Sequence, residues 1–163
     1  MFQHSVGAAM FAQEIARTTR RNVEDAFMCG LLHDVGRPVI LQALVQILAE
    51  QKLRVPASAI IAATGELHCE VGGTLAESWG LPEAVEMSIR HHHSLTPPDA
   101  HINSVRITAL ADQMARFTFD PERMAEAELR KHPALAPLEL YPEMLDKVLA
   151  KGESIRQAAG ALS

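Results

Sequence analysis

Apolar positions along this chain recur at the three- to four-residue spacing of amphipathic α-helices. Val6, Met10 and Ile15, together with alanines such as Ala8, follow a helical pattern in the first segment. Asn22 is typical of a helix N-cap, and Gly80 is typical of a helix end because glycine tolerates the left-handed backbone found there. The pattern predicts helices over residues 1–19, 22–34, 38–52, 56–63, 66–79, 82–92 and 104–117.

Glycine and proline set the breaks between these helices. Gly36 is predicted to end the helix over 22–34, and Thr64-Gly65 to separate those over 56–63 and 66–79. Residues 38–52 are rich in Val and Leu, which predicts a mostly buried helix. The proline-rich segment 94–100 predicts a loop, and the less regular C-terminal part predicts helices near 121–131, 140–150 and 153–161. No segment shows good strand alternation, so the fold class is predicted to be all-α.

Composition indicates a globular protein. The 163 residues are 48% hydrophobic and 21% charged, which suits a single domain over residues 1–163. A net charge of −5 and the lack of a basic stripe argue against a nucleic-acid partner. We found no signal peptide, no lipidation motif and no apolar run near the ~18 residues of a membrane helix. These features predict a cytoplasmic protein without a membrane partner.

Histidine and aspartate supply the candidate chemistry. The chain has eight histidines. His33-Asp34 ends an apolar helix, where burying both side chains is costly unless a partner, such as a metal ion, compensates them. Further candidates come from separate segments that a helical bundle can bring together. The predicted metal ligands are His4, His33, Asp34, His68, His92, His93 and Asp112.

This ligand set exceeds the needs of one tetrahedral ion and predicts two. Adjacent helical residues point about 100° apart, so His33 and Asp34 cannot chelate one ion as an i, i+4 pair would. At a helix end, His33 can bind one ion while Asp34 bridges to a second. His4 and Asp112 would complete the first shell, and His68, His92 and His93 the second. Mixed nitrogen and oxygen ligands suit Fe, Mn, Zn or Ni better than Ca.

Each candidate also has an ordinary structural interpretation. His4 or Asp112, taken alone, is more typical of a surface or capping residue, and the run at 91–93 could be a solvated helix end, with His91 as its clearest case. His101 and His132 lie beside loop signals and are interpreted as ordinary surface residues. Both cysteines are interpreted as small buried hydrophobes, although one of them directly follows His68: Cys29 and Cys69. The motifs of serine hydrolases and phosphate-binding loops are absent.

Several phrases of the sequence together resemble the HDOD branch of the HD superfamily of metal-dependent phosphohydrolases. They are His4-Ser5, the segment 26–37 ending in His-Asp-Val-Gly-Arg, the segment 68–83 ending in Trp-Gly-Leu-Pro-Glu, Ile-Arg-His-His-His at 89–93 and Leu-Ala-Asp at 110–112. The resemblance spans about residues 1–117 and implies an HD-like helical bundle. It assigns the core HD ligands to His4, His33, Asp34 and Asp112. It assigns the second-metal histidines of HD-GYP relatives, which are cyclic-di-GMP phosphodiesterases, to His68, His92 and His93.

The sequence departs from that family pattern at three places. Arg37 stands where active relatives usually have lysine, and no Gly-Tyr-Pro follows the histidine pair. The helices that usually precede the first ligand helix are missing, which predicts a fragment. Three functions stay open: a metal-binding signal-transduction module with a protein partner, a phosphohydrolase or phosphodiesterase acting on a phosphate ester or nucleotide, and a structural domain with remnant ligands. In the second, Asp34 and Arg37 would be the catalytic residues.

Overall fold

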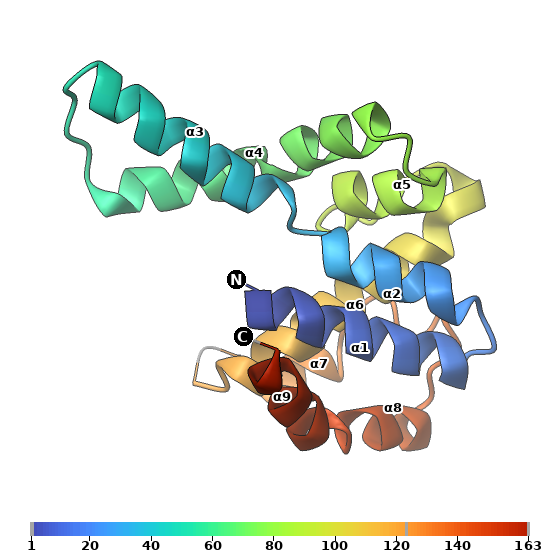
Figure 1. Cartoon of the computed structure of the whole chain (residues 1–163). Coiled ribbons are helices and arrows are strands. Elements are labelled where there is room, and N and C mark those ends of the chain that lie inside the picture. Colours follow the sequence, from blue (N-terminus) through green and yellow to red (C-terminus); the bar gives the residue numbers. More distant parts are fainter. Residues whose placement is uncertain (1, 123, 163) are drawn as a thin grey trace.

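The structure is a computed structural model that describes residues 2–122 and 124–162 (Figure 1). It confirms the all-α prediction, with no strand in the described part of the chain. Four helices form the body around the candidate site: α1 (Phe2–Thr18), α2 (Val23–Leu32), α5 (Glu83–His91) and α6 (Ile102–Phe119). Helix α1 packs against α2 and α6, and α5 packs against the same two helices.

The remaining helices extend or cover this body. They are α3 (Gly36–Glu50), α4 (Ala57–Ser78), α7 (Glu126–Leu129), α8 (Pro142–Leu149), α9 (Gly152–Ala161) and the short 3₁₀ helix η1 (Asp99–His101). Helices α8 and α9 lie against α1, on the side away from α3 and α4 (Figure 1). The C-terminal predictions were therefore correct for α8 and α9, whereas the helix expected near 121–131 is the four-residue α7.

Two apolar clusters hold the helices together. The larger joins α1, α6 and the C-terminal helices around Phe11, Ile15, Leu110 and Met114, all fully buried. Burying side chains of this size contributes about 1.5–3 kcal/mol each relative to leaving them exposed. The smaller cluster joins α2, α4 and α5, and it contains Cys29. The candidate site lies where the helices of the two clusters meet, so both clusters fix its geometry.

Helix α3 and residues 57–67 of α4 form a hairpin that projects from the body, here called the arm (Figure 1). Within α3, Gly36 and Ile40 are buried, whereas Val45 is 56% exposed and Ile47 is 51% exposed. The prediction of a mostly buried helix over 38–52 was therefore wrong. Val39 is also exposed, whereas the leucines of this helix are half-buried: Leu41, Leu44 and Leu48.

One predicted break is present but shifted, and one is absent. Helix α2 ends at Leu32, before the turn at residues 33–35, and Gly36 begins α3 instead of ending α2. Helix α4 runs without interruption for 22 residues through Thr64-Gly65. The Thr64 hydroxyl donates to the Ile60 carbonyl one turn earlier, so this residue fits inside a helix. The predictions at the other ends were correct. The Asn22 side chain accepts from the backbone N–H groups of Glu24 and Asp25, and Gly80 has φ +64°.

The stretch Val23–Glu50 is long and apolar enough, by length and composition alone, to cross a membrane. The expectation that no such run exists was therefore wrong. In the structure, the turn at residues 33–35 divides this stretch into α2 and α3. Figure 1 shows the two helices running in different directions from that turn. The turn carries His33 and Asp34 into the polar cluster described next.

Candidate metal centre

Five helices deliver polar side chains to one place in the body. His33 is the C-cap residue of α2 and Asp34 follows it, while His92 is the C-cap residue of α5. His68 lies at the middle of α4. The structure thus brings together every one of the predicted ligands, arranged as three overlapping groups: His4, His33 and Asp112; His33, Asp34 and His92; and His68, Cys69, His92 and His93.

Three of the histidine rings are oriented by their own helices. The Nδ1 atoms of His33 and His68 each lie 2.7 Å from a backbone carbonyl three residues earlier, and Nδ1 of His92 lies 3.0 Å from the Ile89 carbonyl. With Nδ1–H donating to a carbonyl, each ring directs Nε2 into the cluster. The Nε2 atoms of His33 and His92 are buried and have no hydrogen-bond partner among the described residues. This arrangement is the usual one for metal-binding histidines.

Two carboxylates face these Nε2 atoms. Oδ1 of Asp112 lies 2.9 Å from Nε2 of His4 and 3.4 Å from Nε2 of His33. Oδ1 of Asp34 lies 3.3 Å from Nε2 of His68, and its Oδ2 lies 3.7 Å from Nε2 of His33. Asp34 therefore stands between the two halves of the cluster, which is the position predicted for a bridging ligand.

Burial and neighbouring charges raise the pKa of one histidine in the cluster and lower that of another. Burial lowers the pKa of His33, but the Asp112 and Asp34 carboxylates outweigh it, so this pKa is raised. Burial, together with His33 and His93, lowers the pKa of His92 to about 3. The pKa of Asp112 is well below its ordinary value because its histidine and arginine neighbours outweigh burial. A proton on His33 thus partly balances two carboxylates, and a divalent ion would replace that proton.

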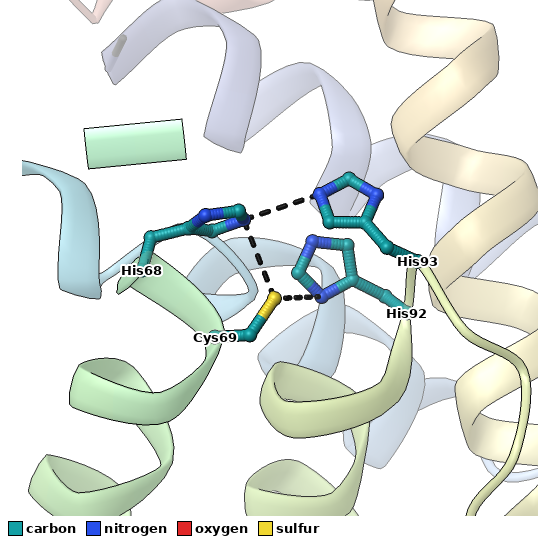
Figure 2. Close-up of side chains that lie close together, drawn as sticks. All are labelled: His68, Cys69, His92 and His93. Carbon is teal, nitrogen blue, oxygen red and sulfur yellow. Dashed lines mark hydrogen bonds between the residues drawn. The ribbon is translucent and has the colours of Figure 1, made fainter. Parts of the chain in front are cut away.

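Two functional candidates were missed or discounted at the sequence level. Cys69 is half-buried, with Sγ 3.4 Å from Nε2 of His68 and 4.0 Å from Nδ1 of His92 (Figure 2). Burial raises the pKa of its thiol to about 11. Arg116 binds Asp112 through Nε to Oδ1 and a terminal nitrogen to Oδ2, both at 3.0 Å. In the sequence, Cys69 could have been identified by its position next to His68. Arg116 could have been identified by its i, i+4 spacing from Asp112.

An open cavity of about 780 Å³ adjoins the cluster. Its polar wall includes His4, Asp34, Arg37 and Arg116. Nε of Arg37 lies 2.7 Å from Oδ1 of Asp34. The apolar wall comes partly from the arm and partly from the end of α6: Leu41, Ile60, Ile61 and Phe119. Arginine forks suit phosphate oxygens, so the cavity could take a phosphate-containing ligand beside the candidate ions.

The other histidines lie outside the three groups. His91 is half-buried at the end of α5, and His101 approaches Glu83 at 3.4 Å. His132 is buried, contrary to the prediction of an ordinary surface residue, and its Nδ1 accepts from the backbone N–H of Ala134. It therefore stabilises the turn after α7.

Comparison with known proteins gives consistent results. The HDOD domain family matches residues 1–95. An uncharacterized protein of Treponema pallidum (strain Nichols) is 32% identical over 118 residues, which cover 66% of this chain and 23% of that protein. The crystal structure of an HDOD domain protein of unknown function from Geobacter sulfurreducens matches with a TM-score of 0.71 at 26% identity, covering 99% of this chain and 62% of that one.

This chain thus spans about a quarter of the length of the Treponema protein and under two thirds of the Geobacter chain. The family match covers more than half of the chain, and the fold agrees with that of the solved relative. On these grounds the chain belongs to the HDOD domain family.

Proposed function

We propose that this HDOD domain is a metal-binding signal-transduction module with a two-ion centre. The observation that carries the proposal is the common orientation of His33, His68 and His92. Each uses Nδ1 on a backbone carbonyl and directs Nε2 toward the carboxylates, and two of these Nε2 atoms are buried without a hydrogen-bond partner in the described chain. Leaving the buried Nε2 of His92 without a partner costs about 1–3 kcal/mol, and a bound ion would remove that cost.

The proposed ligands divide into two shells that share a carboxylate. One ion would take His4, His33 and Asp112; the other would take His68, His92 and His93; Asp34 would bridge them. Fe, Mn, Zn and Ni suit this donor set. When bound, such ions polarise a phosphoryl oxygen and acidify a water molecule.

The adjoining cavity favours the alternative function, a phosphohydrolase or phosphodiesterase. Arg37 and Arg116 line the same cavity as the candidate ligands His4 and Asp34. Two guanidinium groups can hold a phosphate and stabilise charge that develops on it, while Asp34 orients the reacting group. The apolar wall suits the base or sugar of a nucleotide. In a signalling module the same cavity would bind the nucleotide as a regulator, and a protein partner would respond to it.

The two-ion centre is tested by elemental analysis of protein purified without a chelator or a nickel column. We expect two equivalents of transition metal per chain after reconstitution. Less than one equivalent would refute the centre, and one equivalent would restrict binding to a single shell.

The two functions are separated with metal-loaded protein, bis-p-nitrophenyl phosphate and a panel of cyclic dinucleotides. Hydrolysis is expected to depend on manganese or iron, and cyclic-di-GMP is expected to be a poor substrate because the Gly-Tyr-Pro segment is absent. Arg37→Ala should lower turnover without lowering metal content, since the guanidinium would contact the phosphate. Full metal occupancy without hydrolysis or nucleotide binding would leave the signalling role alone.

A further inference from the structure

We propose that Cys69 is a metal ligand, so that the half of the centre formed by His68, His92 and His93 gains a sulfur donor beside the bridging Asp34 and suits a thiophilic ion such as zinc. This inference rests on the proposed metal-binding function and deepens it. It adds one ligand to the set and changes the expected metal at one of the two positions.

Two distances to Nε2 of His68 are close to those between neighbouring ligands of one zinc ion. Zinc binds histidine nitrogen at about 2.0–2.1 Å and cysteine sulfur at about 2.3 Å, so ligand atoms at tetrahedral angles lie about 3.3–3.6 Å apart. Nε2 of His68 lies 3.4 Å from Sγ of Cys69 and 3.1 Å from Nε2 of His93. All four residues offer ligand atoms within 4.8 Å of one another.

A second observation points to a ligand in the same place. His92 is 3% exposed, and its buried Nε2 has no hydrogen-bond partner in the described part of the chain. Figure 2 shows the rings of His68, His92 and His93 and the Cys69 sulfur converging on one another. With Nδ1–H of His68 given to the Gly65 carbonyl, its Nε2 is a lone-pair donor that both Cys69 and His93 approach.

The two cysteines have different surroundings, and only those of Cys69 contain other candidate metal ligands. Cys29 is fully buried in an apolar cluster, and its sulfur contacts the Ala84 carbonyl at 3.5 Å. Cys69 is half-buried among imidazole nitrogens. On binding, the Cys69 thiol loses its proton to solvent and the sulfur donates an electron pair to the ion. Cys29 is therefore a matched control for Cys69.

Cobalt(II) reports sulfur ligation directly. Reconstituted wild-type protein is expected to show a thiolate-to-cobalt charge-transfer band in the near-ultraviolet. Cys69→Ala and Cys69→Ser should abolish the band, while Cys29→Ala should retain it, with circular dichroism checking that each variant is folded. The two Cys69 variants should also bind zinc at least about tenfold more weakly, with a much smaller change for manganese, which prefers oxygen and nitrogen.

Zinc-loaded wild-type protein gives a test that needs no substitution, because X-ray absorption should detect one sulfur at about 2.3 Å from zinc. Full metal occupancy without a sulfur neighbour, or with a charge-transfer band that survives Cys69→Ser, would overturn the Cys69 assignment and leave the two-ion centre intact. Failure of the wild-type protein to bind any of these metals would overturn both proposals.

Discussion

Replacing Gly36 with alanine tests how tightly the base of the arm is fixed. A Cβ atom at this position would lie 2.2 Å from the carbonyl oxygen of His68 and 2.9 Å from the backbone nitrogen of Gly72. Both neighbours are backbone atoms of α4, so neither can rotate away as a side chain would. To relieve the overlap, α3 must separate from α4 where Arg37 and His68 approach each other.

The expected loss follows from two opposing terms. Overpacking of a close contact costs about 1–3 kcal/mol, and a clash with backbone on the far side belongs at the upper end. Replacing a helical glycine with alanine recovers up to about 1 kcal/mol of backbone entropy. The net destabilisation of Gly36→Ala is therefore about 2 kcal/mol, which corresponds to a fall in Tm of about 4–8 °C for a domain of this size.

Gly65→Ala is the matched control, because a Cβ at Gly65 would meet no atom within 4 Å in the described part of the chain. Thermal melts and urea titrations of the metal-free proteins should show Gly65→Ala stabilised by up to about 1 kcal/mol. Metal titration should show weaker binding for Gly36→Ala alone. An unchanged Tm for Gly36→Ala would mean that α3 and α4 can separate at little cost. The base of the arm would then not be tightly fixed.

Three further outcomes are expected. Asp34→Ala should lose more metal than His68→Ala in elemental analysis, because Asp34 approaches both halves of the cluster; greater loss from His68→Ala would contradict a bridging role. Asn22→Ala should destabilise the fold by about 1 kcal/mol in urea, since it removes the acceptor for two N–H groups at the start of α2, and no change would show that water replaces the cap equally well. The metal-free protein should lose stability between about pH 6.5 and 3, because unfolded His92 takes up a proton near its ordinary pKa of 6.5 while burial holds its folded pKa at about 3. The raised pKa of His33 acts in the opposite direction, so a free energy of unfolding that rises toward pH 4 would show that His33 dominates.

Helical periodicity and capping residues were sufficient to predict the fold class. The residue types of the centre, together with the resemblance to the HD superfamily, predicted which side chains converge. Thr64-Gly65 misled because intrinsic propensities are weak beside the packing that a long helix gains. The prediction of a mostly buried helix over residues 38–52 was wrong for another reason. The spacing of its apolar residues shows which side chains could be buried, but whether a neighbouring element covers them depends on tertiary structure.

Cys69 shows the same limit at the level of a single side chain. A cysteine beside a histidine in a helix is most often a small core residue. Its environment here depends on how α4 meets the end of α5, which places His92 and His93 next to its sulfur. No local pattern contains that information, because the two segments are separated by a turn and packed by the cluster around Val85 and Ile89.

The base of the projecting arm lies beside the candidate centre, so any movement of the arm would pivot there. Asp34, Arg37 and His68 all lie close to its base, and its first helix has 15 residues, or about 22 Å at 1.5 Å per residue. A tip displacement of about 5 Å would rotate α3 by about 13° and move atoms 5 Å from the pivot by about 1 Å, whereas metal sites tolerate about 0.2 Å. If the proposed ions bind, bending the arm would weaken their binding, and by reciprocity an ion in the centre would stiffen the arm.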